Sequence, residues 1–287
     1  MGRSDGRLVK NIPALDRVIP HIMSKRYDAT NFCKVEFDMG NLQKFLRELR
    51  IEGYPVGVMD AVITAFARLL QKTPELNRFI ANKKIYERNH VCVSFVILKR
   101  AEEAVEESAI KVYIEPKDDL LAISQKIRTA IAENENIQAE NAMDRFVNRL
   151  MSLPLLPGFL VGLIKFADRR GILPRKIIDL SPFHTSMFIS NLASIQMDAV
   201  YHHLYDFGTT SLFVTMGKPN RISDKDGDVK RTMSLGVSID ERICPGAVWA
   251  KALYEFKRNL EKPERLLNEQ PVEKVEQEVE ESVALYR

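Results

Sequence analysis

The spacing of hydrophobic and polar positions predicts strands and helices in mixed order along the chain. Residues 29–38 (ATNFCKVEFD) alternate between apolar and polar side chains, the pattern of a half-buried strand. In residues 41–50 (NLQKFLRELR), leucine and phenylalanine recur at helical spacing. The strongly apolar segment 58–70 (VMDAVITAFARLL) predicts a helix buried on most sides, which Pro74 stops.

The rest of the chain continues this mixture without regular strand–helix–strand repetition. It contains no glycine-rich dinucleotide loop, Walker sequence or internal repeat. The sequence therefore predicts an α/β fold with a mixed sheet. The remaining strands are predicted at residues 91–98, 109–114, 187–191, 211–216 and 232–239, and the remaining helices at 120–133 and 246–260.

Composition describes an ordinary globular protein. The 287 residues are 45% hydrophobic and 28% charged, and the net charge of +3 gives no argument for a nucleic-acid partner. The basic N-terminal arm, with Arg3, Arg7 and Lys10, is expected to be solvated. The glutamate-rich tail beyond Leu267 is expected to fray or be disordered, and to be dispensable for folding.

The cysteines bear on the cellular compartment. Cys33, Cys92 and Cys244 are odd in number, and no two lie at a metal-ligand spacing. This argues against a disulfide framework or a zinc site. Residues 1–10 are polar and do not resemble a signal peptide, so we expect a reducing, cytoplasmic location.

One apolar stretch, residues 150–166 (LMSLPLLPGFLVGLIKF), is broken by Pro154, Pro157 and Gly158. The uninterrupted part, 159–166, is too short to span a bilayer, which needs about 20 apolar residues. It could lie on a membrane surface, with the basic residues that follow it on lipid headgroups. It could also pack onto the protein as a lid or a subunit contact, which we favour.

Four stretches, in order, resemble the catalytic domain of 2-oxo acid dehydrogenase acyltransferases. TPELN at 73–77 is similar to the family's PELN, and MFISNLASI at 187–195 is similar to FTISNLGSIG. SIDERICPGA at 238–247 is similar to SFDHRVIDGA, which carries the active site, and NLEKPERLL at 259–267 is similar to LLEDPELLL. Each stretch alone is weakly specific, and their order and spacing carry the resemblance.

The resemblance implies a chloramphenicol-acetyltransferase-like fold, a mixed β-sheet flanked by helices in a two-layer sandwich. It covers residues 19–267, with an arm at 1–18, a helical insertion at 141–179 and an acidic tail at 268–287. It also implies a homotrimer whose active sites are channels between neighbouring subunits. In that family coenzyme A enters from one side and dihydrolipoamide from the other. We expect no lipoyl domain in this chain.

The family's catalytic residues are only partly matched. Ser190 falls where the family has the serine that donates to the oxyanion. Glu241, however, stands in place of the catalytic histidine and Pro245 in place of an Asn or Asp. The paired glycines after the serine strand are also replaced, by Gln196 and Met197. Three further residues of the active-site motif are retained: Asp240, Arg242 and Gly246.

Each candidate residue has a structural alternative. Glu241 could be a base whose pKa is raised by burial, but we favour a glutamate that pairs with Arg242 or with a neighbouring subunit. Ser190 could donate to an oxyanion, or could be a strand serine bonded to backbone. Cys244 could be a reactive thiol, but we favour a buried core residue.

The loop YHHLYDFG, residues 201–208, supplies two histidines close in sequence to Ser190. Either His202 or His203 could be a relocated general base, or both could belong to a surface or interface pair. On an extended segment the two would point opposite ways, so only one could serve. His184 is a weaker candidate. Three aromatic residues of this loop could line an acyl tunnel or a trimer interface: Tyr201, Tyr205 and Phe207.

Three functions remain open on these grounds. The first is acyl transfer from a coenzyme A thioester, between a small-molecule donor and acceptor, with a base that is not the family's histidine. The second is a catalytically inactive trimer that serves as a scaffold or binding protein. The third is a peripheral membrane protein whose insertion docks on lipid and whose site handles a fatty acyl group.

Overall fold

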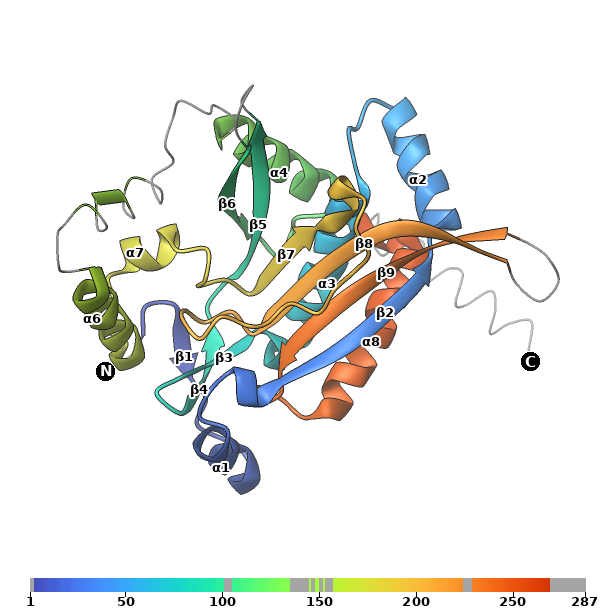
Figure 1. Ribbon diagram of the computed structural model, residues 1–287. Helices are drawn as coiled ribbons and strands as arrows, with labels where there is room; N and C mark the ends of the chain where they lie inside the picture. Colours follow the sequence, from blue (N-terminus) through green and yellow to red (C-terminus); the bar gives the residue numbers. More distant parts are fainter. Residues whose placement is uncertain are drawn as a thin grey trace, which may run out of the picture.

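The computed structural model describes residues 3–100, 105–134, 145, 148–149, 152, 157–223 and 229–268 (Figure 1). Most of the predicted acidic tail, residues 269–287, lies outside this part of the chain, as does most of 135–156, where the predicted insertion begins. The division into arm, domain and tail therefore stays a prediction.

A six-stranded mixed sheet forms the centre of the molecule, in the order β2-β9-β8-β7-β5-β6. The pairs β5–β7 and β7–β8 are parallel and the other three pairs are antiparallel. The predicted mixed α/β architecture is confirmed. The strands are β2 (Thr30–Asp38), β5 (Val91–Arg100), β6 (Val105–Ile114), β7 (Met187–Asn191), β8 (Leu212–Ser223) and β9 (Val229–Asp240).

Helices cover one face of this sheet and make the second layer (Figure 1). They are α2 (Gly40–Ile51), α3 (Val58–Lys72), α4 (Leu120–Asn134) and α8 (Gly246–Glu261). The apolar sequence of α3 buries most of its side chains, and Phe66 stacks on Phe256 of α8 at a centroid distance of 3.9 Å. Burial of these aromatic rings holds the two helices together against the sheet.

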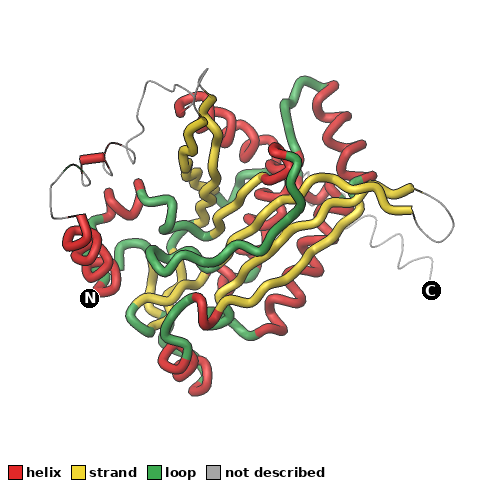
Figure 2. The backbone as a smooth tube through the Cα atoms, viewed as in Figure 1, coloured by secondary structure: helices red, strands yellow, loops and turns green. Residues whose placement is uncertain are grey.

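The opposite face of the sheet is crossed by an irregular segment, residues 196–211, which we call the strap (Figure 2). The strap follows the short helix η3 (Leu192–Ile195) and approaches the strands closely. A Cβ on Gly236 would lie 2.2 Å from the carbonyl oxygen of Val200, and one on Gly217 would lie 2.3 Å from the backbone nitrogen of Ala199. Glycine at these two strand positions therefore lets the strap rest on the sheet.

A second, three-stranded sheet lies beside the first, in the order β1-β4-β3, and the sequence analysis missed it. Its strands are β1 (Gly6–Leu8), β3 (Arg78–Ala81) and β4 (Lys84–Arg88), too short for a clear alternation of polar and apolar positions. The remaining helices are α1 (Ala14–Ile22), α6 (Pro157–Arg170) and α7 (Arg175–Leu180), with short 3₁₀ turns η1 (Tyr27–Ala29), η2 (Pro74–Asn77) and η4 (Pro263–Leu266).

The expectation of a solvated N-terminal arm is wrong for its first described residues. Arg3 is buried and donates two hydrogen bonds to Asp5, of 2.8 and 3.0 Å, and one of 2.7 Å to Asp168 of α6. Burial alone would raise the pKa of Asp168, but His184 and Arg3 hold it at about 2. The arm is therefore tied to α6 by a buried charge network that no sequence pattern indicates.

Replacing Arg3 should destabilise the protein strongly, because Asp5 and Asp168 would stay buried without their cation. We expect Arg3→Ala to lower the free energy of unfolding by about 3–5 kcal/mol. Arg7→Ala, which removes an exposed cation four residues on, should change it by less than about 0.5 kcal/mol. Urea denaturation of both variants measures the difference. Equal stabilities would show that the arm does not depend on this network.

Candidate active site

The motif at the end of β9 is built around one buried carboxylate. Arg242 forms a bidentate pair with Asp240, at 2.8 and 2.7 Å, and its third nitrogen donates to the carbonyl of Met23. Arg26 lies on the other side, with Nε 3.8 Å from Asp240 Oδ2. Asp240 is fully buried, and a buried carboxylate without a cationic partner would be costly. The retained Asp and Arg of the motif thus have a structural role in this chain.

Glu241 is not in a position to act with Ser190 in one chain. Its carboxylate accepts a 2.5 Å hydrogen bond from Asn31 on the edge strand β2 and does not pair with Arg242, so of the favoured alternative only the pairing with a neighbouring subunit stays a prediction. Ser190 is level with Thr215 and therefore with Gly236, five residues before Glu241. At about 3.3 Å per residue the two side chains lie about 16 Å apart along the strands.

Ser190 lies at the end of β7, on the face that the strap crosses. It alternates with Ile189, which points into the helix-side core, and shares its face with Phe188. Within the described chain no group is hydrogen-bonded to its hydroxyl, in contrast to Thr215 beside it, which donates to the Val200 carbonyl. The Ser190 hydroxyl is partly exposed and free to donate to a ligand.

His202, on the strap, lies over the same face. Its ring stacks on Phe213 with a centroid distance of 4.0 Å and an interplanar angle of 8°. Phe213 pairs in register with Phe188, two residues before Ser190, so the histidine is about 7 Å from Ser190 along the strand direction. Two residues that are twelve apart in sequence therefore lie on the same face of the sheet.

The backbone fixes which ring nitrogen of the neutral His202 side chain carries the hydrogen. Its Nδ1 lies 2.8 Å from the carbonyl oxygen of His203, which can only accept, so Nδ1 carries the hydrogen and Nε2 keeps a lone pair. Burial lowers the pKa of His202 below its usual value, and this effect outweighs the hydrogen bond to the His203 carbonyl, which raises it. The imidazole is therefore neutral at pH 7, as a general base must be.

His203 is exposed, and its ring stacks on that of His202 at 4.4 Å and 25°. The expectation that the two histidines point opposite ways is wrong, because the strap is not a regular extended strand here. Tyr205 packs edge-on against His203 and beside Phe188 and Phe213. The histidine pair is thus part of an aromatic cluster that holds the strap on the sheet.

The weaker candidates are buried. His184 is fully enclosed, 2.8 Å from Ser181 Oγ, and its Nε2 is 3.2 Å from Asp168, close enough for an ion pair but not aligned for a hydrogen bond. Ser181 is also buried, so this Ser–His–Asp set has no access to substrate. Burial raises the pKa of Cys244 to about 12, which keeps it a thiol in the core.

A cationic cavity opens near Ser190 on the helix side of the sheet; we call it the α2 cavity. It has a volume of about 710 Å³, and Asn191, the neighbour of Ser190, is part of its wall. Among the described residues no carboxylate lines it, and none of its cations forms an ion pair. The cations are Lys44, Arg47, Arg50 and Arg231, which come from α2 and β9 and which the sequence analysis did not single out.

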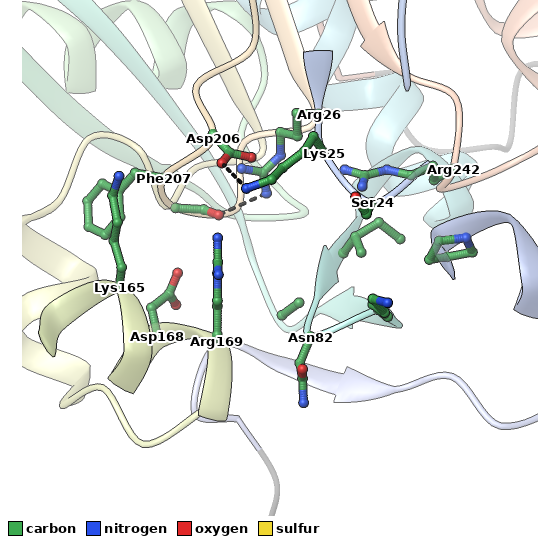
Figure 3. Close-up of a pocket in the computed structure, with 15 residues that line it drawn as sticks. Ser24, Lys25, Arg26, Asn82, Lys165, Asp168, Arg169, Asp206, Phe207 and Arg242 are labelled. Carbon is green, nitrogen blue, oxygen red and sulfur yellow. Dashed lines mark hydrogen bonds and ion pairs between the residues drawn. The ribbon is translucent and has the colours of Figure 1, made fainter. Parts of the chain in front are cut away.

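A second cavity, of about 230 Å³, lies on the other side of the motif, and we call it the α6 cavity (Figure 3). Arg26 and Arg242 line it, together with residues of α6 and of the β3–β4 turn. Within the part of the chain that is described, no cluster of three or more histidine, cysteine or carboxylate side chains suits a metal ion. The charged side chains around the motif are therefore suited to a ligand held by ion pairs and hydrogen bonds.

Comparison with known proteins identifies the fold. No protein-family model and no curated protein matches the sequence. Solved structures do match, among them a probable dihydrolipoamide acetyltransferase from Listeria monocytogenes 4b F2365, with 18% identity, TM-score 0.55, and coverage of 93% of this chain and 98% of that one.

Two other structures agree. The truncated catalytic core of the 2-oxoacid dehydrogenase multienzyme complex from Thermoplasma acidophilum is 13% identical, with a TM-score of 0.55 and coverage of 90% and 99%. A chloramphenicol acetyltransferase is 9% identical, with a TM-score of 0.54 and coverage of 89% and 99%. The chain has the chloramphenicol-acetyltransferase-like fold, as its sequence motifs predicted.

Proposed function

We propose that this protein transfers an acyl group from a coenzyme A thioester to a small nucleophilic acceptor, with His202 as the general base. The observation that carries the proposal is the hydrogen bond from His202 Nδ1 to the His203 carbonyl. It presents a neutral Nε2 on the face that also holds the Ser190 hydroxyl. The acyltransferase-like fold of the structural neighbours supports the same class of reaction.

The reaction needs two protein groups. His202 Nε2 takes the proton from the thiol, amine or hydroxyl of the acceptor. At the same time a lone pair on the acceptor's sulfur, nitrogen or oxygen attacks the thioester carbonyl carbon. The Ser190 hydroxyl donates a hydrogen bond to the oxyanion that forms. The C–S bond then breaks, and the departing coenzyme A thiolate takes the proton back from the imidazolium. The acyl product and free coenzyme A are released.

The α2 cavity suits the nucleotide end of coenzyme A. That end carries three phosphate groups, and the cavity offers four cations without a competing carboxylate. Its volume lies within the range of about 300–1,000 Å³ that is usual for small-molecule sites. Asn191 lines the cavity and its neighbour Ser190 faces the strap, so the pantetheine arm would have to pass from one face to the other at the end of β7.

We propose further that the protein is a homotrimer in the cytoplasm. Strand β2 is an open edge of the main sheet, and it presents Phe32, 53% exposed, beside Tyr201, 51% exposed. An open edge with large apolar side chains is a typical site for a second chain. A subunit contact on this edge would also bring Glu241 of one copy toward another copy. The three unpaired cysteines fit a reducing compartment.

Substitution of the two proposed catalytic residues should abolish most of the activity. With a panel of acyl-coenzyme A donors and thiol, amine and hydroxyl acceptors, we expect His202→Ala and Ser190→Ala each to slow coenzyme A release about 100-fold or more. Wild-type kcat/KM should rise with pH and then level off, with the midpoint of the rise below about pH 6.5, because burial lowers the pKa of His202 and only the neutral ring accepts a proton.

His203→Ala is the matched control, since it keeps the backbone carbonyl that orients His202 and should change the rate only a few-fold. Light scattering should give the same trimer for every variant. No release by wild type with any pair, or equal rates in all variants, would instead favour the second candidate function, a catalytically inactive trimeric scaffold. The replacement of the family's histidine by Glu241 is the observation that keeps this alternative.

Removal of cations from the α2 cavity should weaken coenzyme A binding selectively. We expect Arg47→Gln with Arg231→Gln to raise the calorimetric Kd for coenzyme A about tenfold or more, as two charge-assisted contacts are lost. Lys72→Gln, an exposed cation at the end of α3, is the control. Turnover of an N-acetylcysteamine thioester, which lacks the phosphates, should stay unchanged. A loss of that turnover too would mean that the variants disturb the fold.

A peripheral contact with a membrane is a third candidate function, and the exposed apolar side chains of α6 are the observation that favours it. Phe159, Leu163 and Phe166 form an outward stripe and are 69%, 52% and 51% exposed. Among the described residues this stripe is not covered by its own chain as a lid would be, and the subunit contact that the sequence analysis also allowed stays a prediction. Arg169 and Arg170 follow at the end of the helix, as in helices that lie on anionic lipid. None of the described helices is long and apolar enough to cross a bilayer.

Vesicle flotation tests this contact. Wild type should float with vesicles that contain phosphatidylserine, and Phe159→Ser with Phe166→Ser should reduce the bound fraction about tenfold, since two exposed rings are lost. The control removes Leu15 and Ile22, which are as exposed on α1, by the same change to serine. If the α6 variant instead floats like wild type but dissociates into smaller oligomers, the stripe is a subunit contact.

A further inference from the structure

The α6 cavity gathers positive charge from segments that are far apart in the sequence. Six cationic side chains line it, against two carboxylates, Asp168 and Asp206. Asp168 is already paired with Arg3, and Asp206 lies 3.4 Å from Lys25. The cations are Lys25, Arg26, Lys83, Lys165, Arg169 and Arg242.

Three of these cations have no anionic partner among the described residues: Lys83, Lys165 and Arg169. In Figure 3, Arg169 rises from α6 into the cavity, while Lys25 points in from the opposite side. Like charges that converge in this way repel each other, which costs free energy unless an anion lies between them. The arrangement is therefore suited to a ligand that carries more than one negative charge.

The buried wall of the cavity keeps an excess of positive charge. Arg26 and Arg242 share the single carboxylate of Asp240, and Arg26 Nε has no hydrogen-bond acceptor in the described chain. Burial lowers the pKa of Arg26; Asp240 raises it and Arg242 lowers it again. A bound anion would stabilise this pair of arginines.

The β3–β4 turn places a lysine at the cavity at the expense of backbone strain. Asn82 and Lys83 have φ values of 48° and 60°, the left-handed conformation of a type I′ hairpin turn. Asparagine is common in the first position, but the second is normally glycine, and other residues cost about 1 kcal/mol or more there. Lys83 nevertheless occupies this unfavourable position, and its side chain lines the cavity. Both observations are consistent with a binding role for its ammonium group.

We propose that the α6 cavity binds a small phosphate monoester, separately from the acyl-transfer site. The unpaired cations match the two negative charges of such a group, and arginine and lysine are the usual phosphate ligands. The volume of about 230 Å³ lies below the range of about 300–1,000 Å³ for larger ligands, which favours a molecule of the size of glycerol phosphate over a nucleotide.

Calorimetry with glycerol 3-phosphate, and with glycerol as the uncharged control, tests this site. Wild type should bind the phosphate and not glycerol, with an affinity that falls as salt rises. Lys165→Gln with Arg169→Gln should raise the Kd about tenfold or more. Arg170→Gln is the matched control on the same helix, because Arg170 lies over Phe166, 4.9 Å from the ring centre, and does not line the cavity.

Lys83→Gly separates binding from stability. Glycine relieves the left-handed conformation, so the melting temperature should stay equal or rise, while the Kd for glycerol 3-phosphate rises about tenfold. Vesicles with phosphatidic acid, compared with phosphatidylcholine, distinguish a lipid headgroup from a free phosphate as the source. No binding by wild type at millimolar ligand, or equal weakening by Arg170→Gln, would overturn the proposal.

Discussion

The carboxylate of Asp240 is the group on which the arrangement of the site depends. It is fully buried at the end of β9 and holds Arg242 by two hydrogen bonds, with Arg26 close by. Arg26 in turn donates to the carbonyls of Tyr205 and Gly208, at 2.7 and 2.8 Å, and so fixes the end of the strap. A buried ion network therefore anchors the segment that carries His202. The loss of this carboxylate would leave two buried guanidinium groups without a counter-charge.

The two faces of the sheet divide the proposed chemistry. The helix side provides an open cationic cavity, and the strap side provides a neutral imidazole and a free hydroxyl. The two sides come together at the end of β7, where side chains alternate between the faces of the sheet. Asn191 faces the cavity and Ser190 faces the strap. A thioester held at the end of this strand would have its charged end among arginines and its carbonyl near the base.

The motif at the end of β9 is held in place by packing and charge pairing in the core. Asp240 and Arg242 keep their places because they satisfy each other in the core, and that need does not depend on catalysis. Glu241 lies between them in the sequence, but its side chain is near the surface and bonded to Asn31. It therefore takes no part in the buried pairing of Asp240 with Arg242.

The sequence by itself determined the elements of the main sheet and its helical layer, and their order along the chain, but not the smaller three-stranded sheet. Periodicity located all six strands of the main sheet and the four helices that cover it, because burial imposes a repeat on every such segment. The quoted motifs led to the correct fold. Only the tertiary structure decided which polar groups meet: the ring stack of His202 and His203, the burial of Arg3, the separation of Ser190 from Glu241, and the cations of the two cavities. These contacts join residues far apart in the chain or depend on irregular backbone. Such contacts produce no repeating pattern in the sequence, since each is fixed by the packing of one segment on another.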